Sequence, residues 1–206
     1  MTRFVVPVLL VAGALTCVAQ DCSTDDNAMV GGVPVAAAAS FAIDNGVVTV
    51  TLSNLMADPR SAGQLLNGVA FTLSSGLTVG TLGDSSAPIR KVQDGGTYVD
   101  LGVQPTGWAL MSNVNGGLGL CVLCTNLGAP GPKRLLIGAP GPSNTYASAN
   151  ASIAGNKPHN PFTTDQATFV INVPGAMFGD KVTSLSFSFS TAAGMSVTGS
   201  CRKPIE

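Results

Sequence analysis

The cysteines carry the clearest chemistry in this sequence of 206 residues. There are five, and once Cys17 is set aside with the first 19 residues, Cys22, Cys121, Cys124 and Cys201 remain. An even number of cysteines in an exported chain indicates disulfides. The spacing of Cys121 and Cys124 also suits a redox pair or half of a zinc site, but there is no second Cys-x-x-Cys and only one histidine. We therefore predict two disulfides, for which three pairings are open.

Among these pairings we favour Cys121 with Cys124 and Cys22 with Cys201. Cys121 and Cys124 are three positions apart, and the glycines at 116, 117 and 119 allow the irregular turn that a local bridge needs. Cys22 and Cys201 then lie near opposite ends of the mature chain. The termini of a domain are often close together, which would bring these two sulfurs within reach.

His159 is the only histidine, so any Ser-His or Cys-His nucleophilic mechanism would have to use it. No Gly-x-Ser-x-Gly nucleophile motif occurs. A glycosidase needs two poised carboxylates, and no pair of aspartates is singled out by its position. We therefore predict no catalytic residue and expect His159 to be a loop residue, with a secreted hydrolase as one alternative.

Aromatic side chains define the first alternative, a carbohydrate-binding module, which ranks before the hydrolase. Sugars stack on exposed aromatic rings, and Trp108, Tyr98 and Tyr146 are the candidates, with His159 as a further ligand contact. A single tryptophan is more often a core anchor. Whether these rings share an exposed face or lie in the core decides between the two interpretations.

We predict no cofactor, with Ca²⁺ as the one metal considered. Two groups of hard oxygen ligands are candidates for it: Asp25, Asp26 and Asn27 as one, and Asp94 with Asp100 as the other. The spacing of an EF-hand loop is absent from both.

The first 19 residues have the pattern of a signal peptide. Arg3 supplies a positive charge, residues 4–15 an apolar run, and Cys17-Val18-Ala19 the small residues at the cleavage site. The apolar run is shorter than the roughly 20 residues of a spanning helix. We expect the mature chain to begin at Gln20, secreted or at the cell surface, without membrane insertion after cleavage.

The composition limits which classes of partner and which fold class are expected. Lys and Arg number 10 and Asp and Glu 11, for a net charge of −1, without a run of either sign, so nucleic acid is not an expected partner. Charged residues make up only 10% of the chain, and Glu206 is the sole glutamate, so strong charged helix formers are nearly absent. Ser, Thr, Val and Gly fill their place, which favours strands joined by tight turns.

Alternating apolar residues locate the strands. Residues 41–43 and 47–52 flank Asn45-Gly46 and predict a hairpin. Residues 65–74 alternate, as do residues 167–173 and 182–190, and we predict that the last two pair as a hairpin. Their predicted core side chains are Phe169, Ile171, Leu185, Phe187 and Phe189. Residues 146–162 are polar and predict a long ordered loop.

These elements predict an all-β domain, a two-layer antiparallel sandwich of the jelly-roll or immunoglobulin-like kind. We expect residues 1–19 to be the signal peptide, 20–40 an N-terminal lead-in without regular structure, and 41–206 a single sandwich domain.

Several stretches together resemble bacterial exported proteins associated with the exosortase (PEP-CTERM) sorting system. The matching stretches lie at residues 48–54, 68–74, 105–108, 136–140, 151–156, 158–162 and 167–169, with the Pro-His-Asn-Pro-Phe segment the most specific. This resemblance implies a β-rich surface or matrix protein and supplies no catalytic residues. The sorting tail of that family, with its Pro-Glu-Pro and apolar segment, is lacking here, which favours free secretion. The expected function is therefore that of an exported, non-enzymatic surface or extracellular matrix protein, with polysaccharide or other cell-surface proteins as its partners.

Overall fold

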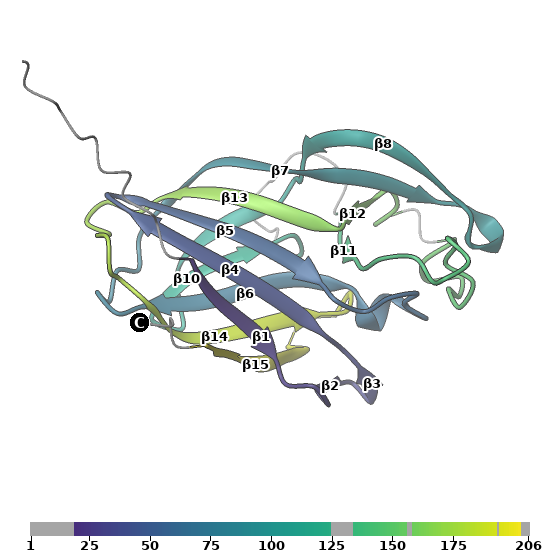
Figure 1. Ribbon diagram of the computed structural model, residues 1–206, viewed down its shortest axis with the longest axis horizontal. Coiled ribbons are helices and arrows are strands. Elements are labelled where there is room, and N and C mark those ends of the chain that lie inside the picture. Colours follow the sequence, from purple (N-terminus) through teal and green to yellow (C-terminus); the bar gives the residue numbers. More distant parts are fainter. Residues whose placement is uncertain (1–18, 125–133, 156–157, 193, 203–206) are drawn as a thin grey trace, which may run out of the picture.

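The computed structural model describes residues 19–124, 134–155, 158–192 and 194–202, and strands dominate throughout (Figure 1). The strands are β1 (Gln20–Thr24), β2 (Met29–Val30), β3 (Val33–Pro34), β4 (Ala37–Asp44), β5 (Val47–Asn54), β6 (Leu66–Leu73), β7 (Thr81–Val92), β8 (Tyr98–Pro105), β9 (Ala109–Val114), β10 (Gly117–Cys121), β11 (Leu136–Ile137), β12 (Phe162–Thr164), β13 (Gln166–Asn172), β14 (Val182–Phe189) and β15 (Ser196–Cys201). Two 3₁₀ turns, Ala62–Gln64 and Asp94–Gly96, complete the regular structure. No helix among these residues is long and apolar enough to cross a membrane.

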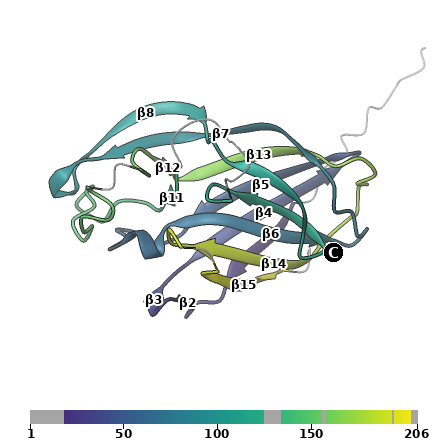
Figure 2. The same ribbon diagram turned by 180° about the vertical axis from the view of Figure 1, so that it is seen from behind.

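The strands form two layers that continue into each other at a corner. One layer runs β8-β7-β13-β5-β4-β1 and the other β15-β14-β6-β10-β9, with β1 paired to β15 at the corner (Figures 1 and 2). On the far side β11 pairs with β6, and β12 pairs with β7, so the short β11–β12 pair links the layers there as well. The predicted all-β sandwich is confirmed, and only β11–β12 is parallel among the described pairings.

The core lies between the layers and follows the alternation in the sequence. Phe41 on β4 packs against Phe71 on β6, with ring centroids 5.0 Å apart. The predicted hairpin at Asn45-Gly46 is present as β4 and β5, and Gly46 has a φ of 81°, which favours glycine at this turn. The predicted strand at residues 65–74 is β6, whose alternate side chains Val69, Phe71 and Leu73 are buried.

The predicted hairpin between residues 167–173 and 182–190 is wrong in its pairing. β13 lies between β5 and β7, whereas β14 lies between β6 and β15 in the other layer. The connection after β13 is held on the β4–β5 turn instead, because Val173 N donates to Gly46 O and Gly46 N to Ala176 O, both at 2.7 Å. The five side chains predicted for the core are nonetheless all buried. Alternation fixes which face of a strand is apolar, and both layers turn such a face inward.

The predicted lead-in at residues 20–40 is also corrected. β1 is a full member of the sheet between β4 and β15, and Cys22 and Thr24 point into the interior. β4 begins at Ala37, where alternate alanines are buried. Alanine and serine have low strand propensity, so the pattern that marks β1 and the start of β4 is weak in the sequence.

Candidate functional site

The four cysteines form two disulfides with the predicted pairing. Cys22 on β1 bonds Cys201 on β15, and Cys121 at the end of β10 bonds Cys124. Cys22 and Cys201 are direct cross-strand partners in the β1–β15 ladder. The bond therefore fastens the corner where one layer continues into the other.

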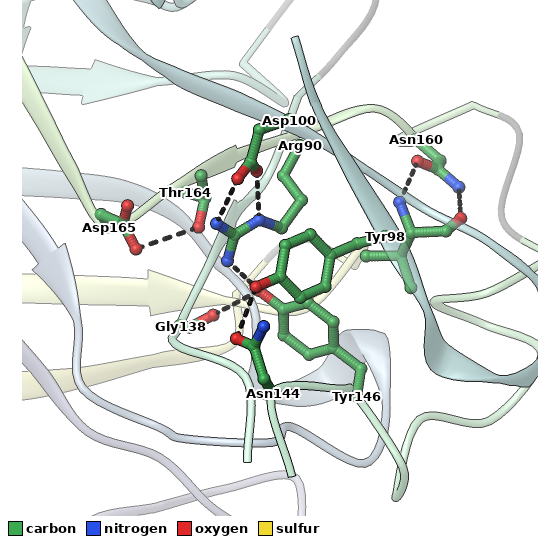
Figure 3. A network of polar contacts seen from close by, with 10 residues as sticks. Arg90, Tyr98, Asp100, Gly138, Asn144, Tyr146, Asn160, Thr164 and Asp165 are labelled. Carbon is green, nitrogen blue, oxygen red and sulfur yellow. Dashed lines mark hydrogen bonds and ion pairs between the residues drawn. The ribbon is translucent and has the colours of Figure 1, made fainter. Parts of the chain in front are cut away.

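Arg90 on β7 is the centre of a cluster of polar contacts (Figure 3). Its cross-strand partner on β8 is Asp100, and the two side chains meet in a two-pronged ion pair, with Nε donating to Oδ1 at 2.6 Å and Nη2 to Oδ2 at 3.1 Å. Nη1 donates to the hydroxyl of Tyr146 at 3.2 Å. The Arg90 side chain is 9% exposed and that of Asp100 is 57% exposed, so the pair bridges the interior and the solvent.

Two tyrosines complete this cluster. The guanidinium of Arg90 lies 3.9 Å from the ring centroid of Tyr98, a cation–π contact. Tyr98 packs edge-on against Tyr146 at 5.8 Å and donates its hydroxyl to Asn144 Oδ1 at 2.6 Å. Tyr146 donates to the carbonyl of Gly138 at 2.9 Å.

Gly96 lets the loop that carries Tyr146 approach the turn between β7 and β8. The backbone N–H of Tyr146 donates to Gly96 O at 2.8 Å, and Gly96 has a φ of 80°. A Cβ at Gly96 would clash with the carbonyl group of Tyr146. The segment around residues 138–146 is thus anchored to β7 and β8 by both backbone and side chains.

Burial and hydrogen bonding act in opposite directions on the pKa values of Arg90 and Tyr146. Burial alone would lower the pKa of Arg90, but the hydrogen bonds to Asp100 and Tyr146 outweigh it and raise that pKa. Burial raises the pKa of Tyr146, and the hydrogen bond from Arg90 opposes this only in part. Arg90 is therefore charged and Tyr146 neutral at ordinary pH.

The Arg90 cluster is built to hold the fold together. Tyr146 is fully buried, and the guanidinium, both tyrosine hydroxyls and the Asp100 carboxylate all have partners within the protein. Sequence reasoning missed Arg90, because a lone arginine in a strand gives no pattern until the β7–β8 register is known.

Trp108 and Tyr146 do not form the exposed aromatic platform considered above. Trp108 is 3% exposed, packs on Phe169 with ring centroids 5.3 Å apart, and donates its indole N–H to Arg134 O at 2.9 Å. Tyr146 is buried under Arg90, and only Tyr98 is partly exposed. The prediction that these rings contact a ligand is therefore wrong for Trp108 and Tyr146, because both fill the interior.

His159 lies in the polar loop predicted at residues 146–162 and is 9% exposed. The neighbouring Asn160 uses its side-chain amide to pair with both backbone groups of Val92, at 3.2 and 2.6 Å (Figure 3). This pairing fixes the end of the loop against β7.

The two candidate Ca²⁺ sites have different surroundings. Both carboxylate oxygens of Asp100 face Arg90, so its pairing with Asp94 as a metal site is not supported. Residues 25–27 form an exposed turn after β1, closed by Ala28 N donating to Asp25 O at 3.1 Å. Within the described ranges no group of three or more His, Cys, Asp or Glu side chains is placed to hold a metal ion.

A hollow lies between the start of β14 and the end of β15, beside the β1–β15 corner. It has a volume of about 880 Å³ and is lined by Gln20, residues 181–185 and residues 199–202; we call it the corner hollow. Lys181 and Arg202 are its charged residues, and none of the lining residues is acidic. Polar and apolar residues both line it, and it is open to the solvent.

Comparison of this chain with protein families, with curated proteins and with solved structures gives no match.

Proposed function

We propose that this protein is exported and works outside the cell as a non-enzymatic surface or extracellular matrix protein. The observation that carries the proposal is the disulfide between Cys22 and Cys201. Such bonds form and persist in oxidising compartments outside the cytoplasm. The signal-peptide pattern of residues 1–19 and the resemblance to exosortase-associated exported proteins support the same location.

The residue chemistry supports a binding or structural role. The polar groups of the cluster around Arg90 bond to one another and anchor a loop. The outward positions of β14 are Thr183, Ser184, Ser186 and Ser188, which present hydroxyl groups to the solvent. Hydroxyl-rich sheet faces over an apolar core suit a protein that contacts other surface components.

Expression of the full sequence in a bacterium, followed by fractionation and intact-mass measurement, tests export. We expect the product outside the cytoplasm to begin at Gln20, with the mass deficit of two disulfides. Leu10→Arg, which places a charge in the apolar run, should retain the protein in the cytoplasm. Cys17→Ala is the matched control, because alanine also satisfies the cleavage site. Cytoplasmic accumulation of the unaltered chain, or free thiols in exported material, contradicts the proposal.

A panel of ester and glycan substrates tests the non-enzymatic role. We expect no turnover above the buffer rate. Reproducible hydrolysis that His159→Ala abolishes, with the thermal transition unchanged, would instead identify a secreted hydrolase.

A further inference from the structure

Three asparagines in this chain directly precede a glycine: Asn45, Asn67 and Asn115. Asparagine is a chemically labile residue. Its side-chain amide can be lost when the backbone nitrogen of the next residue attacks Cγ, and a following glycine has no side chain to hinder that attack. The three pairs are alike in sequence, but the structure gives them different surroundings.

The pair at Asn67 is held within the fold. The Asn67 side chain is 6% exposed, and its Nδ2 donates to the carbonyls of Phe189 and Ser190 at 2.7 and 2.6 Å. Gly68 lies in β6, which has β10 on one side and β14 on the other. The amide that would have to leave is therefore engaged, and the nitrogen that would attack is fixed inside the layer.

The pair at Asn45 is exposed, but its backbone is held by the chain that follows β13. Gly46 N donates to Ala176 O at 2.7 Å, and Gly46 O accepts from Val173 N at 2.7 Å. The nitrogen must give up its hydrogen bond before it can attack Cγ. That loss adds a free-energy cost to the reaction.

The pair at Asn115 forms the two-residue turn between β9 and β10. Asn115 and Gly116 have φ values of 49° and 78°, as in a type I′ hairpin turn. Both are exposed, and a Cβ built on Gly116 would have no atom within 4 Å. Among the described residues no acceptor is placed for the Gly116 N–H and no partner for the Asn115 side-chain amide. Local opening of an exposed turn costs little free energy, so the nitrogen can reach Cγ.

We propose that Asn115 is a site of spontaneous deamidation, with water as the co-reactant. Gly116 N gives up its proton and bonds to Cγ of Asn115, while the Cγ–Nδ2 bond breaks and Nδ2 leaves as ammonia with that proton. Water then opens either C–N bond of the resulting five-membered imide, which yields aspartate or isoaspartate. Either product adds one negative charge, and isoaspartate also adds one carbon to the backbone of the turn. This assignment does not depend on the proposed extracellular role.

Incubation of the folded, disulfide-bonded protein in warm, mildly alkaline buffer tests the site, because the attacking nitrogen must lose its proton. Peptide mapping at intervals, with fragmentation that distinguishes isoaspartate from aspartate, gives the rate at each asparagine. We expect Asn115 to convert at least about fivefold faster than Asn45, the factor that corresponds to a hydrogen bond of about 1 kcal/mol at Gly46 N. Asn67 should be the slowest of the three.

Two controls separate the effect of the fold from that of the local sequence. In urea, where the surroundings of all three pairs are lost, their rates should become similar. Asn115→Gln would need a six-membered ring, so it should remove the early mass gain of the folded protein, whereas the matched Asn45→Gln should leave that gain unchanged.

Three outcomes contradict this proposal. One is conversion at Asn45 as fast as at Asn115 in the folded protein. Another is an Asn115 that stays intact in the folded protein over the time in which it converts in urea. The third is an equal lead of Asn115 in urea, which would show that the local sequence selects it. Circular dichroism at each time point verifies that the folded sample remains folded.

Discussion

Cys22 and Cys201 lie directly opposite each other on β1 and β15, although 179 residues separate them in the sequence. The bond joins the first and last long strands at the corner where the two layers meet. It also fixes the end of β15 that borders the corner hollow. The same covalent link thus connects the stability of the sandwich to the geometry of this hollow.

Removing this disulfide should cost far more stability than removing the local one. The entropy of closing a loop grows with its length, giving about 5 kcal/mol for the Cys22–Cys201 loop and about 2 kcal/mol for the Cys121–Cys124 loop, both as upper figures. Urea melts of Cys22→Ser/Cys201→Ser and of the matched control Cys121→Ser/Cys124→Ser measure the difference. Equal losses in the two double variants would show that chain entropy does not set the contribution of the long bridge.

The ion pair of Arg90 and Asp100 should respond unequally to the loss of either partner. Asp100→Ala leaves a largely buried cation without its carboxylate, whereas Arg90→Met leaves a carboxylate that solvent can reach. We expect a loss of about 2 to 3 kcal/mol for Asp100→Ala, against about 1 to 2 kcal/mol for Arg90→Met.

The double variant Arg90→Met/Asp100→Ala is the control for this pair. It should be more stable than Asp100→Ala alone, because the double variant no longer contains the buried cation that Asp100→Ala leaves unpaired. Denaturant melts of the three proteins give the comparison. A loss under roughly 0.5 kcal/mol for Asp100→Ala would mean that solvent stabilises Arg90 without its partner.

Tyr146 should make the protein sensitive to high pH. Burial raises its pKa above the ordinary value of about 10, so the folded state holds the phenol proton more tightly than the unfolded state. This contribution is complete below about pH 10 and is lost as the pH rises through the folded pKa. Urea melts from pH 8 upward should show a steeper decline for the unaltered protein than for Tyr146→Phe. Parallel declines in the two proteins would contradict this assignment.

The sequence predicted which face of a strand is buried better than it predicted which strands pair. Alternation at Val69, Phe71 and Leu73 correctly placed β6 on the core, because burial on one side of a strand requires a period of two. The same signal at Phe169 and Leu185 said nothing about which strand each would pair with, since inward faces in both layers look alike. The pairing of Cys22 with Cys201 succeeded because it rested on where chain ends lie in a domain, and the structure confirms it.

The sequence did not predict the surroundings of most candidate site residues. Trp108 and Tyr146 could be named as aromatic residues, but Tyr146 is buried by a loop that folds back onto β7, and Trp108 by packing on Phe169 of β13. Arg90 lies opposite Asp100 because the pairing of β7 with β8 shifts by one residue between Pro88 and Arg90. No local sequence pattern predicts this shift.

Phe187 and Phe178 provide a matched pair for measuring how much the interior contributes. Phe187 on β14 is fully buried, whereas Phe178, in the connection before that strand, is 53% exposed. Phe187→Ala should cost about 3 to 5 kcal/mol, through lost burial and the cavity left between the layers. Phe178→Ala makes the same chemical change and should cost less than roughly 1 kcal/mol, because little surface is uncovered there. Denaturant melts of both variants give the difference, and a small loss for Phe187→Ala would place that ring outside the core.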